Sequence, residues 1–447
     1  MKKIFVKNTY DIKLSDKPSN QVIDQTKITK VALIPDNIPN TKPRLLKKVG
    51  EKVQIGTPVY VDKKNDALCF LSPGSGTISD IQYGKRRKIE KVIINLDKEE
   101  TFVEFEKVSN EAELNNISRD SLVDLLVKGG LWSLFVEYPF GLPPKKETVA
   151  PAIYLSLDED EPHSVNSEVI LDGSISDLKF GIKILEKLTN EVNVSIRQDN
   201  PIKDQLSSVV THEVYGDYPA NKPGTVLFYD KKDMTKNKSW GIYAQDLLRI
   251  VQLFKSGRYP IERVVTIAGP RVRQSSHYKI REGSAVSEIV QLKDSEKEVR
   301  YIFGGVLTGR SSGDDGFIGY KEYSINVLND DYQPELVPFV KLGFDKHTFG
   351  KTYFSWLLNK PDWQMNTSLN GGERSCINCS ICPNVCPMDI LPQFLMKSVL
   401  ANDVEESMSQ GLLDCVECGL CDYVCPSKIE LTSIVQEKKL DLYKEIS

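Results

Sequence analysis

Eight of the nine cysteines in the chain lie in two short runs near its C-terminus. Both runs have the spacing C-x-x-C-x-x-C-x-x-x-C-P, which is the spacing by which thiolates hold a pair of 4Fe-4S clusters. We therefore predict a two-cluster, ferredoxin-like segment whose chemistry is one-electron transfer. The predicted cofactor-binding and metal-ligating residues are Cys376, Cys379, Cys382, Cys386, Cys415, Cys418, Cys421 and Cys425.

The spacing also predicts which cysteines share a cluster. Three cysteines two residues apart can wrap around one cubane, whereas the fourth lies at the start of a helix that points away and reaches the other cluster. The proline after each fourth cysteine removes a backbone donor and fixes the adjacent turn. We assign one cluster to Cys376, Cys379, Cys382 and Cys425, and the other to Cys415, Cys418, Cys421 and Cys386.

These thiols have two alternative uses. Structural zinc sites also use four thiolates, but they usually pair two C-x-x-C knuckles across a longer gap. A disulfide framework is typical of small secreted domains, and a chain of 447 residues does not need one to fold. Iron–sulfur ligation is therefore favoured over both.

Length and composition limit the remaining possibilities. A chain of 447 residues has room for about three domains. Its 58 basic and 62 acidic residues provide no electrostatic case for nucleic acid as a partner. No apolar stretch approaches the roughly 18 residues of a membrane span, and the N-terminus lacks the pattern of a secretory signal. Thiolate-held clusters favour a reducing compartment, so we expect contact with a membrane only through partner proteins.

The first part of the chain predicts a barrel-sandwich hybrid over residues 1–100. Short strand patterns alternate with turn glycines between residues 27 and 96, in the manner of a lipoyl-type domain. Lys63 or Lys64 would be the carrier lysine of such a domain, but the surrounding hairpin lacks the expected hydrophobic neighbour, so we do not expect lipoylation. The basic run at residues 85–88 favours a solvated loop or a docking patch. Cys69, the ninth cysteine, is expected to be a small buried hydrophobe.

Two further domains and the cluster segment follow. Alternating helix and strand patterns predict a Rossmann-like α/β domain over residues 101–257, with strands at Ala152–Leu157 and Thr225–Tyr229. Residues 258–330 have the pattern strand, strand, helix, strand, which predicts a β-grasp (SLBB-type) module. Residues 331–447 should form a helical domain that holds the two clusters. The fold class is therefore α/β and multidomain.

No catalytic residue can be named from the sequence. The four histidines are scattered without metal-ligand spacing, and each is expected to be structural or exposed. No Ser/His/Asp order or paired-carboxylate motif stands out.

Several motifs, taken with this order of domains, resemble a known family. The chain resembles the NqrA subunit of the Na+-translocating NADH:quinone reductases, and its relative, the RnfC subunit of the Rnf electron-transport complex. The likeness covers nearly the whole chain. The motifs that resemble the NqrA subunit are Gly129-Gly130-Leu131-Trp132, Tyr138-Pro139-Phe140, Gly216-Asp217-Tyr218-Pro219-Ala220, Ser239-Trp240-Gly241-Ile242, Val264–Pro270, Leu307-Thr308-Gly309, the segment that begins at Phe349, and Asn370–Ser375.

The sequence departs from each relative in one respect. Well-known members of the NqrA family have degenerate cluster motifs, whereas this chain keeps all eight thiols, as the Rnf protein does. The Rnf protein resembles the flavin-binding subunit of complex I, whose glycine-rich loop binds FMN and NADH. Here the corresponding stretch, Trp132–Phe140, is bulky and contains an acid, so backbone N–H groups have no close access to a phosphate. We therefore expect no FMN in this domain.

The resemblance implies a peripheral subunit of a respiratory complex that couples electron transfer from NADH to quinone with Na+ export. It also implies membrane and flavoprotein partner subunits, quinone as a possible substrate, and a position on the cytoplasmic face of the bacterial inner membrane. Two alternatives stay open. One is an Rnf-type protein that handles NADH and ferredoxin, and the other is a non-catalytic docking protein whose clusters are structural.

Overall fold

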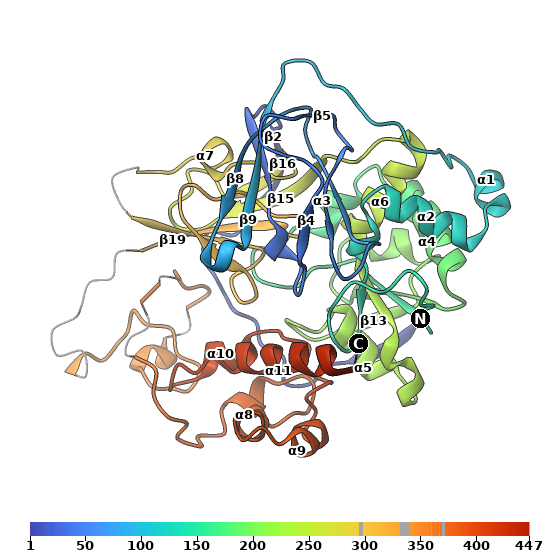
Figure 1. Cartoon of the computed structure of the whole chain (residues 1–447). Helices are drawn as coiled ribbons and strands as arrows, with labels where there is room; N and C mark the ends of the chain where they lie inside the picture. The colour runs from blue at the N-terminus through green and yellow to red at the C-terminus, as the bar shows by residue number, and fades with distance from the viewer. Residues whose placement is uncertain (295–297, 331–339, 359, 366, 369–371, 447) are drawn as a thin grey trace.

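The computed structural model describes residues 1–447 except 295–297, 331–339, 359, 366, 369–371 and 447. The chain forms a multidomain α/β structure with four sheets, as expected. Figure 1 shows the barrel-sandwich strands in blue, the α/β domain in green, the β-grasp module in yellow and the cluster domain in orange and red beneath them. The start of the predicted cluster domain (331–339) and the motif residues Asn370 and Gly371 lie outside the described residues.

The α/β domain is built on a six-stranded sheet in the order β1-β13-β12-β11-β14-β10. All neighbouring strands are parallel except β10 and β14, which are antiparallel. The central strand of such a sheet is buried on both faces, and all four residues of β11 are accordingly buried. The strands are β1 Lys2–Phe5, β10 Val136–Glu137, β11 Ile153–Ser156, β12 Val192–Arg197, β13 His212–Tyr215 and β14 Trp240–Tyr243.

Helices cover both faces of this sheet. The helices α2, α4 and α6 contribute leucines and isoleucines to the largest core cluster, whereas α5 packs on the opposite face against β1 and β11. The sequence of helix α4 explains why it packs on the sheet. Its buried residues recur every three or four positions and form one apolar stripe. The helices are α1 Glu111–Asn116, α2 Arg119–Lys128, α3 Ser167–Leu171, α4 Ile175–Leu188, α5 Pro223–Asp230 and α6 Ala244–Ser256.

The prediction of a strand at Thr225–Tyr229 was wrong, because this segment lies within α5. Its β-branched and aromatic residues favour a strand locally, but Pro223 occupies the first turn, where its fixed φ suits a helix. Val226 and Leu227 are buried against the sheet, and this tertiary packing outweighs the local preference.

The N-terminal segment joins two domains other than the barrel-sandwich hybrid. Strand β1 pairs with β13 of the α/β domain, and β2 (Ser19–Gln25) pairs with β16 of the β-grasp sheet. Within the range 1–100, the barrel-sandwich strands therefore begin at β3. Asp230 anchors β1: it accepts hydrogen bonds from Lys2 and from Tyr154 (2.8 Å) and lies 3.1 Å from His212.

The barrel-sandwich hybrid consists of two small sheets, β3-β9-β8-β5 and β4-β6-β7. Lys63 and Lys64 lie exposed on the connection between β6 and β7, and the basic run is exposed between β8 and β9. Cys69 is half-buried rather than buried, and desolvation raises the pKa of its thiol to about 11. The strands are β3 Lys30–Leu33, β4 Pro43–Leu45, β5 Lys52–Val53, β6 Pro58–Asp62, β7 Cys69–Leu71, β8 Gly76–Tyr83 and β9 Ile89–Leu96.

The β-grasp module contains a mixed sheet in the order β18-β17-β19-β15-β16-β2, with the short helix α7 (Val286–Ile289) beside it. Its own strands are β15 Glu262–Ala268, β16 Ser276–Arg281, β17 Val299–Phe303, β18 Arg310–Ser312 and β19 Ser324–Asn329.

The four histidines of the chain all have hydrogen-bond partners, as expected of structural side chains.

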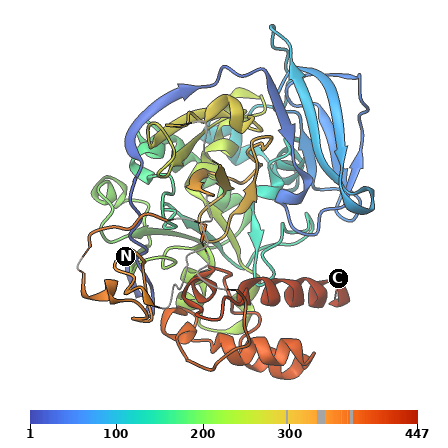
Figure 2. The ribbon, with the colours of Figure 1, turned by 90° about the vertical axis from the view of Figure 1, so that its left-hand side faces the viewer.

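The described residues of the cluster domain include four α-helices, and the domain lies along the base of the molecule in Figure 2. They are α8 Pro392–Leu400, α9 Val404–Ser409, α10 Leu420–Val424 and α11 Leu431–Ile446. The domain docks on the α/β domain, where the Tyr229 hydroxyl donates to the Pro387 carbonyl (2.7 Å) and Lys231 pairs with Asp414 (3.0 Å). No helix among the described residues is both long and apolar enough to cross a bilayer.

Candidate iron–sulfur centres

Two neighbouring cavities in the cluster domain collect the eight cysteines in two groups of four. One cavity is lined by Cys376, Cys379, Cys382 and Cys425, and the other by Cys386, Cys415, Cys418 and Cys421. Each cavity thus takes three cysteines from one run and the fourth from the other run. Leu431, the first residue of α11, lines both cavities and separates them. We call them the outer and the inner site, respectively.

The loops around the two sites have matching backbone conformations. In each run the residues that flank the second cysteine have positive φ: Asn378 and Ser380 in the first run, Glu417 and Gly419 in the second. This left-handed conformation is unfavourable for residues other than glycine, so its recurrence at equivalent positions indicates a geometry that the surrounding structure imposes. The result is a loop that curls tightly around each cavity.

The four thiols of each group line a cavity and do not meet at one point. Among the described residues, no three His, Cys, Asp or Glu side chains are close enough to share one ion. The four thiols instead surround a space with apolar walls, contributed by Ile429 in the outer site and by Ile390, Leu395 and Val435 in the inner site. A cubane with four iron corners and thiolate ligands suits such a space.

The outer site lies near the surface. Cys379 is exposed, and the neighbouring Ile377 is 66% exposed. Cys382 is the buried member of this group; desolvation raises the pKa of its thiol to about 11, and the thiol donates to the Gln393 side-chain oxygen at 3.2 Å. A group bound here is therefore within reach of a partner that docks on this side.

The inner site is more deeply enclosed. Desolvation raises the pKa of Cys415 to about 11 and that of Cys418 to about 12. Burial also raises the pKa of Cys386, although backbone N–H groups of Met388 and Ile390 partly offset the effect. Thiolates are disfavoured in such surroundings unless positive charge accompanies them, which bound iron would supply.

One buried lysine forms an ion pair beside the inner site. Lys439 of α11 is only 3% exposed; its ammonium donates to the Cys415 carbonyl (3.0 Å) and to the Glu417 carboxylate (2.6 Å). It follows Val435 by one helical turn on the buried stripe of α11. The sequence-based prediction missed this residue, and a lysine on an apolar stripe was the signal that could have found it.

Tyr218 links the inner site to the α/β domain. Its hydroxyl donates to the Cys418 carbonyl at 2.8 Å, and its ring lies in a core cluster with Leu420 and Val424 of α10. Tyr218 belongs to the Gly216–Ala220 motif that carried the family resemblance. A role beside a cysteine loop could not be inferred from that motif, because the two segments meet only in the folded chain.

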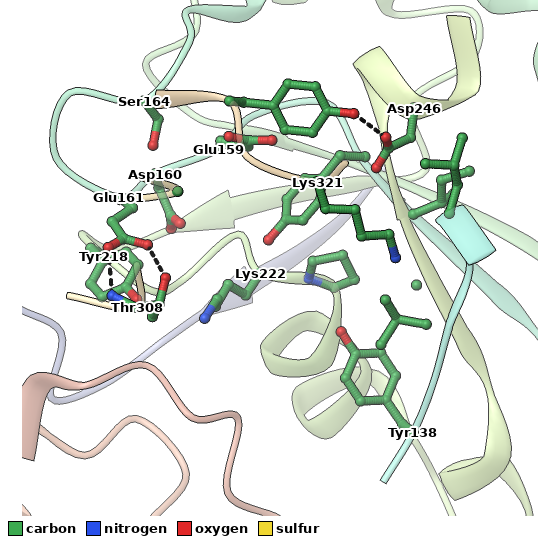
Figure 3. Close-up of a pocket in the computed structure, with 18 residues that line it drawn as sticks. Tyr138, Glu159, Asp160, Glu161, Ser164, Tyr218, Lys222, Asp246, Thr308 and Lys321 are labelled. Atoms are coloured by element: carbon green, nitrogen blue, oxygen red, sulfur yellow. Dashed lines mark hydrogen bonds between the residues drawn. The ribbon is translucent and has the colours of Figure 1, made fainter. Parts of the chain in front are cut away.

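A further cavity of about 200 Å³ lies on the other side of Tyr218, at the carboxyl ends of β11 and β14 (Figure 3). Ligands of open α/β sheets bind at this edge. The loop after β11 contributes Glu159, Asp160 and Glu161, and the β-grasp module contributes Thr308 and Lys321. Figure 3 shows Glu161 held by Thr308, which donates through its hydroxyl at 2.7 Å, while the Lys321 amine points into the cavity.

Enclosure perturbs the titration of this cavity's charged groups. Desolvation and the nearby Asp246 raise the pKa of Glu159 to about 8, and desolvation raises the pKa of Asp160 to about 6. Desolvation lowers the pKa of Lys321 to about 8. Burial thus disfavours the charged forms of these three side chains.

The stretch that would replace a phosphate-binding loop fills space beside this cavity. Trp132 is fully buried, its indole N–H donates to the Pro144 carbonyl (2.8 Å), and its ring meets Trp240 edge to face at 5.4 Å. Leu134, Val136 and Tyr138 from the same stretch line the cavity wall. Side chains therefore occupy the position where glycines would let backbone N–H groups approach a phosphate.

Comparison with known proteins identifies the family. Models for the NqrA N-terminal barrel-sandwich hybrid domain, the NqrA second alpha/beta domain and the NQRA C-terminal domain match residues 4–97, 117–259 and 264–313. The NqrA subunit of the Na(+)-translocating NADH-quinone reductase from Marinomonas sp. (strain MWYL1) is 30% identical over 406 residues, which cover 90% of each chain. The chain belongs to the NqrA family.

Other relatives agree with the assignment. The corresponding subunits of Hahella chejuensis (30% identity, 91% of this chain and 92% of the relative) and Yersinia pestis bv. Antiqua (29%, 91% and 92%) bear the same name. Among solved structures, an NAD+-reducing [NiFe]-hydrogenase chain aligns over 52% of this chain and 53% of its own, at 10% identity and a TM-score of 0.35, and the assignment does not depend on it. A 4Fe-4S dicluster domain model matches residues 375–429, a range that contains all eight cysteines of the two runs.

Proposed function

We propose that the chain is the NqrA subunit of an Na+-translocating NADH:quinone reductase complex and holds two 4Fe-4S clusters. Cys376, Cys379, Cys382 and Cys425 would hold one cluster in the outer site, and Cys415, Cys418, Cys421 and Cys386 the other in the inner site. The observation that carries this proposal is the grouping of four thiols around each cavity, with one cysteine exchanged between the runs, in a chain of this family.

When bound, each cluster supplies the ability to accept and release one electron. The residues of the chain set the conditions for this exchange. Cys379 and Ile377 bring the outer site to the surface, whereas Tyr218 and α11 enclose the inner site. Lys439 places a positive charge beside the inner thiolates and favours the more negative, reduced state. The two sites therefore offer a path between a docking partner and the interior.

The same proposal covers the other cofactors and the partners. We expect no FMN in the α/β domain, because Trp132 and its neighbours fill the space that a phosphate cradle needs. Quinone would be the electron acceptor of the complex, and membrane and flavoprotein subunits would be the partners. The cytoplasmic face of the bacterial inner membrane is the position that this role requires.

The test is metal and cofactor analysis of anaerobically purified protein. We expect about eight irons and eight acid-labile sulfides per chain, a magnetically coupled EPR spectrum after dithionite reduction, and no flavin. Cys69→Ser is the matched control, because Cys69 lies outside both sites and its loss should leave the iron content unchanged.

Other results would contradict the proposal in distinct ways. Zinc in place of iron would refute electron transfer by these sites. Bound FMN together with NADH binding would indicate an Rnf-type protein instead. Clusters that cannot be reduced at physiological potentials would indicate a docking protein with structural clusters.

A further inference from the structure

An exposed group of large apolar side chains is concentrated in one short segment, residues 340–358, which we call the aromatic knob. It lies in the orange loops at the lower left of Figure 1. Seven large apolar side chains of this segment are 39% to 68% exposed, although single exposed apolar residues elsewhere are ordinary. They are Val340, Leu342, Phe344, Phe354, Trp356, Leu357 and Leu358.

Backbone and side-chain contacts hold the knob in shape. The Phe354 N–H donates to the Leu342 carbonyl (2.9 Å), and the Phe344 and Phe354 rings lie 6.2 Å apart. Ser355 is 1% exposed and its hydroxyl donates to the Lys346 carbonyl. The polar residue of this turn thus points inward while its aromatic neighbours point outward, which is the reverse of an ordinary surface loop.

The knob is fastened to the helix that bears cluster cysteines. His347 contacts the Tyr10 hydroxyl through Nε2 (3.1 Å) and the Tyr423 hydroxyl through Nδ1 (2.8 Å). Tyr423 belongs to α10, between Cys421 of the inner site and Cys425 of the outer site. A surface that engages the knob would therefore be held close to both sites.

Lysines are interleaved with these aromatic side chains. The Lys351 ammonium lies 5.3 Å from the Trp356 ring centre, and the Lys360 ammonium lies 4.5 Å from that of Trp363 and donates to the Phe344 carbonyl (3.3 Å). Lysine is depleted in protein–protein interfaces, whereas tryptophan, phenylalanine and leucine beside lysines are typical of surfaces that bind the bilayer interface. Between residues 340 and 363 there are four lysines and two aspartates, a balance that suits anionic lipids.

We propose that the aromatic knob binds directly to the surface of a membrane that contains anionic phospholipid. Trp356, Phe354 and Leu357 enter the headgroup region, and the excess of lysines over aspartates attracts the anionic lipid surface. This inference goes beyond the proposed redox function and does not depend on whether the two sites hold iron. It differs from our expectation from the sequence that contact with a membrane occurs only through partner proteins, and the experiment below tests the two against each other.

The test is binding of the full chain, purified anaerobically, to phosphatidylcholine vesicles with and without phosphatidylglycerol. We expect binding to the anionic vesicles that weakens as salt is added, because screening reduces the lysine contribution. The double variant Phe354→Ser/Trp356→Ser should lose at least about tenfold in partition coefficient. Val149→Ser is the matched control, because Val149 is 60% exposed but lies outside the knob.

A fluorescence measurement guards against misfolding of the double variant. Of the four tryptophans, Trp132 and Trp240 are fully buried and Trp363 is half-buried, whereas Trp356 is 51% exposed. Brominated lipids should therefore quench the wild-type emission, and Trp356→Phe should remove most of this quenching while vesicle binding persists.

Three results would overturn the proposal. They are absence of vesicle binding, binding that the double variant retains, and quenching that persists in Trp356→Phe. If the wild type does not bind vesicles and the double variant does not assemble with the membrane subunits of the complex, the knob is a protein-docking surface and the lipid assignment is wrong.

Discussion

The exchange of the fourth cysteine between the two runs can be tested by removing one ligand at a time. Cys425 belongs to the second run in sequence, but it lines the outer cavity together with Cys376. Replacement of Cys425 with alanine removes one of four ligands from the outer site and leaves all four cysteines of the inner site in place. The iron content should therefore fall from about eight to about four per chain, with the inner-site signal retained.

The assay is iron and sulfide analysis combined with EPR on a set of matched variants. Cys425→Ala and Cys376→Ala should leave the same residual spectrum, whereas Cys386→Ala should match Cys415→Ala. The double variant Cys376→Ala/Cys425→Ala should lose no more iron than either single variant, because both ligands serve one site. If Cys425→Ala instead matched Cys415→Ala, each run would hold its own cluster and the assignment from spacing and cavities would be refuted.

Three further predictions concern residues that support the sites and the fold. Lys439→Met should lower the reduction potential of the inner site by on the order of 50 to 100 mV in an EPR-monitored titration, because a cation that favours the reduced state is lost at an effective dielectric constant of about 20. Lys439→Arg keeps the positive charge and should shift the potential much less. Equal shifts in the two variants would show that the charge of Lys439 does not set the potential. Tyr218→Phe should leave the Cys418 carbonyl without its donor, cost about 1–2 kcal/mol, and speed the loss of inner-site iron to a chelator, with outer-site iron unaffected. Burial alone would raise the pKa of Asp230, but the hydrogen bonds from its neighbours lower this pKa to about 2. The ionised carboxylate therefore stabilises the fold fully above about pH 4, and this stabilisation is lost as the pH falls toward 2. Asp230→Asn should therefore lower the free energy of unfolding, measured in urea at pH 6, by on the order of 1 kcal/mol. The gap between the unfolding free energies of variant and wild type should narrow at pH 3. A gap that stays constant with pH would rule out the ionised carboxylate as its cause.

Tyr218 lies between the inner site and the 200 Å³ cavity. Its hydroxyl contacts the inner-site loop and its ring lines the cavity. Tyr138 also lines the cavity. Its ring and the side chain of Val416, the residue after Cys415, both lie beside Gly224. Tyr218 therefore contacts both the inner-site loop of the cluster domain and the wall of the cavity in the α/β domain.

The sequence by itself predicted an iron–sulfur segment and the order of the domains, and the family models agree with both. Ligand spacing is a local property, because a loop of three cysteines two residues apart has the right curvature for one cubane wherever it lies in a fold. The periodicity of α4, α8 and α11 is local in the same sense, so these helices could be predicted. Cys386 and Cys425 do line the cavity of the opposite run, as predicted. The predicted reason was wrong, because each lies directly after a short helix, Cys382–Val385 or α10, and not at the start of one.

Only the tertiary structure decided what surrounds these elements. Residues 225–229 became helix because packing on the sheet outweighed their local preference for a strand. Strands β1 and β2 joined sheets formed by residues far along the chain, a pairing that depends on the whole topology. The burial of Lys439, the contact of Tyr218 with the Cys418 loop and the exposure of Trp356 likewise depend on residues far away in the sequence. Burial, charge pairing and exposure are properties of neighbours in space, and a sequence pattern specifies only neighbours along the chain.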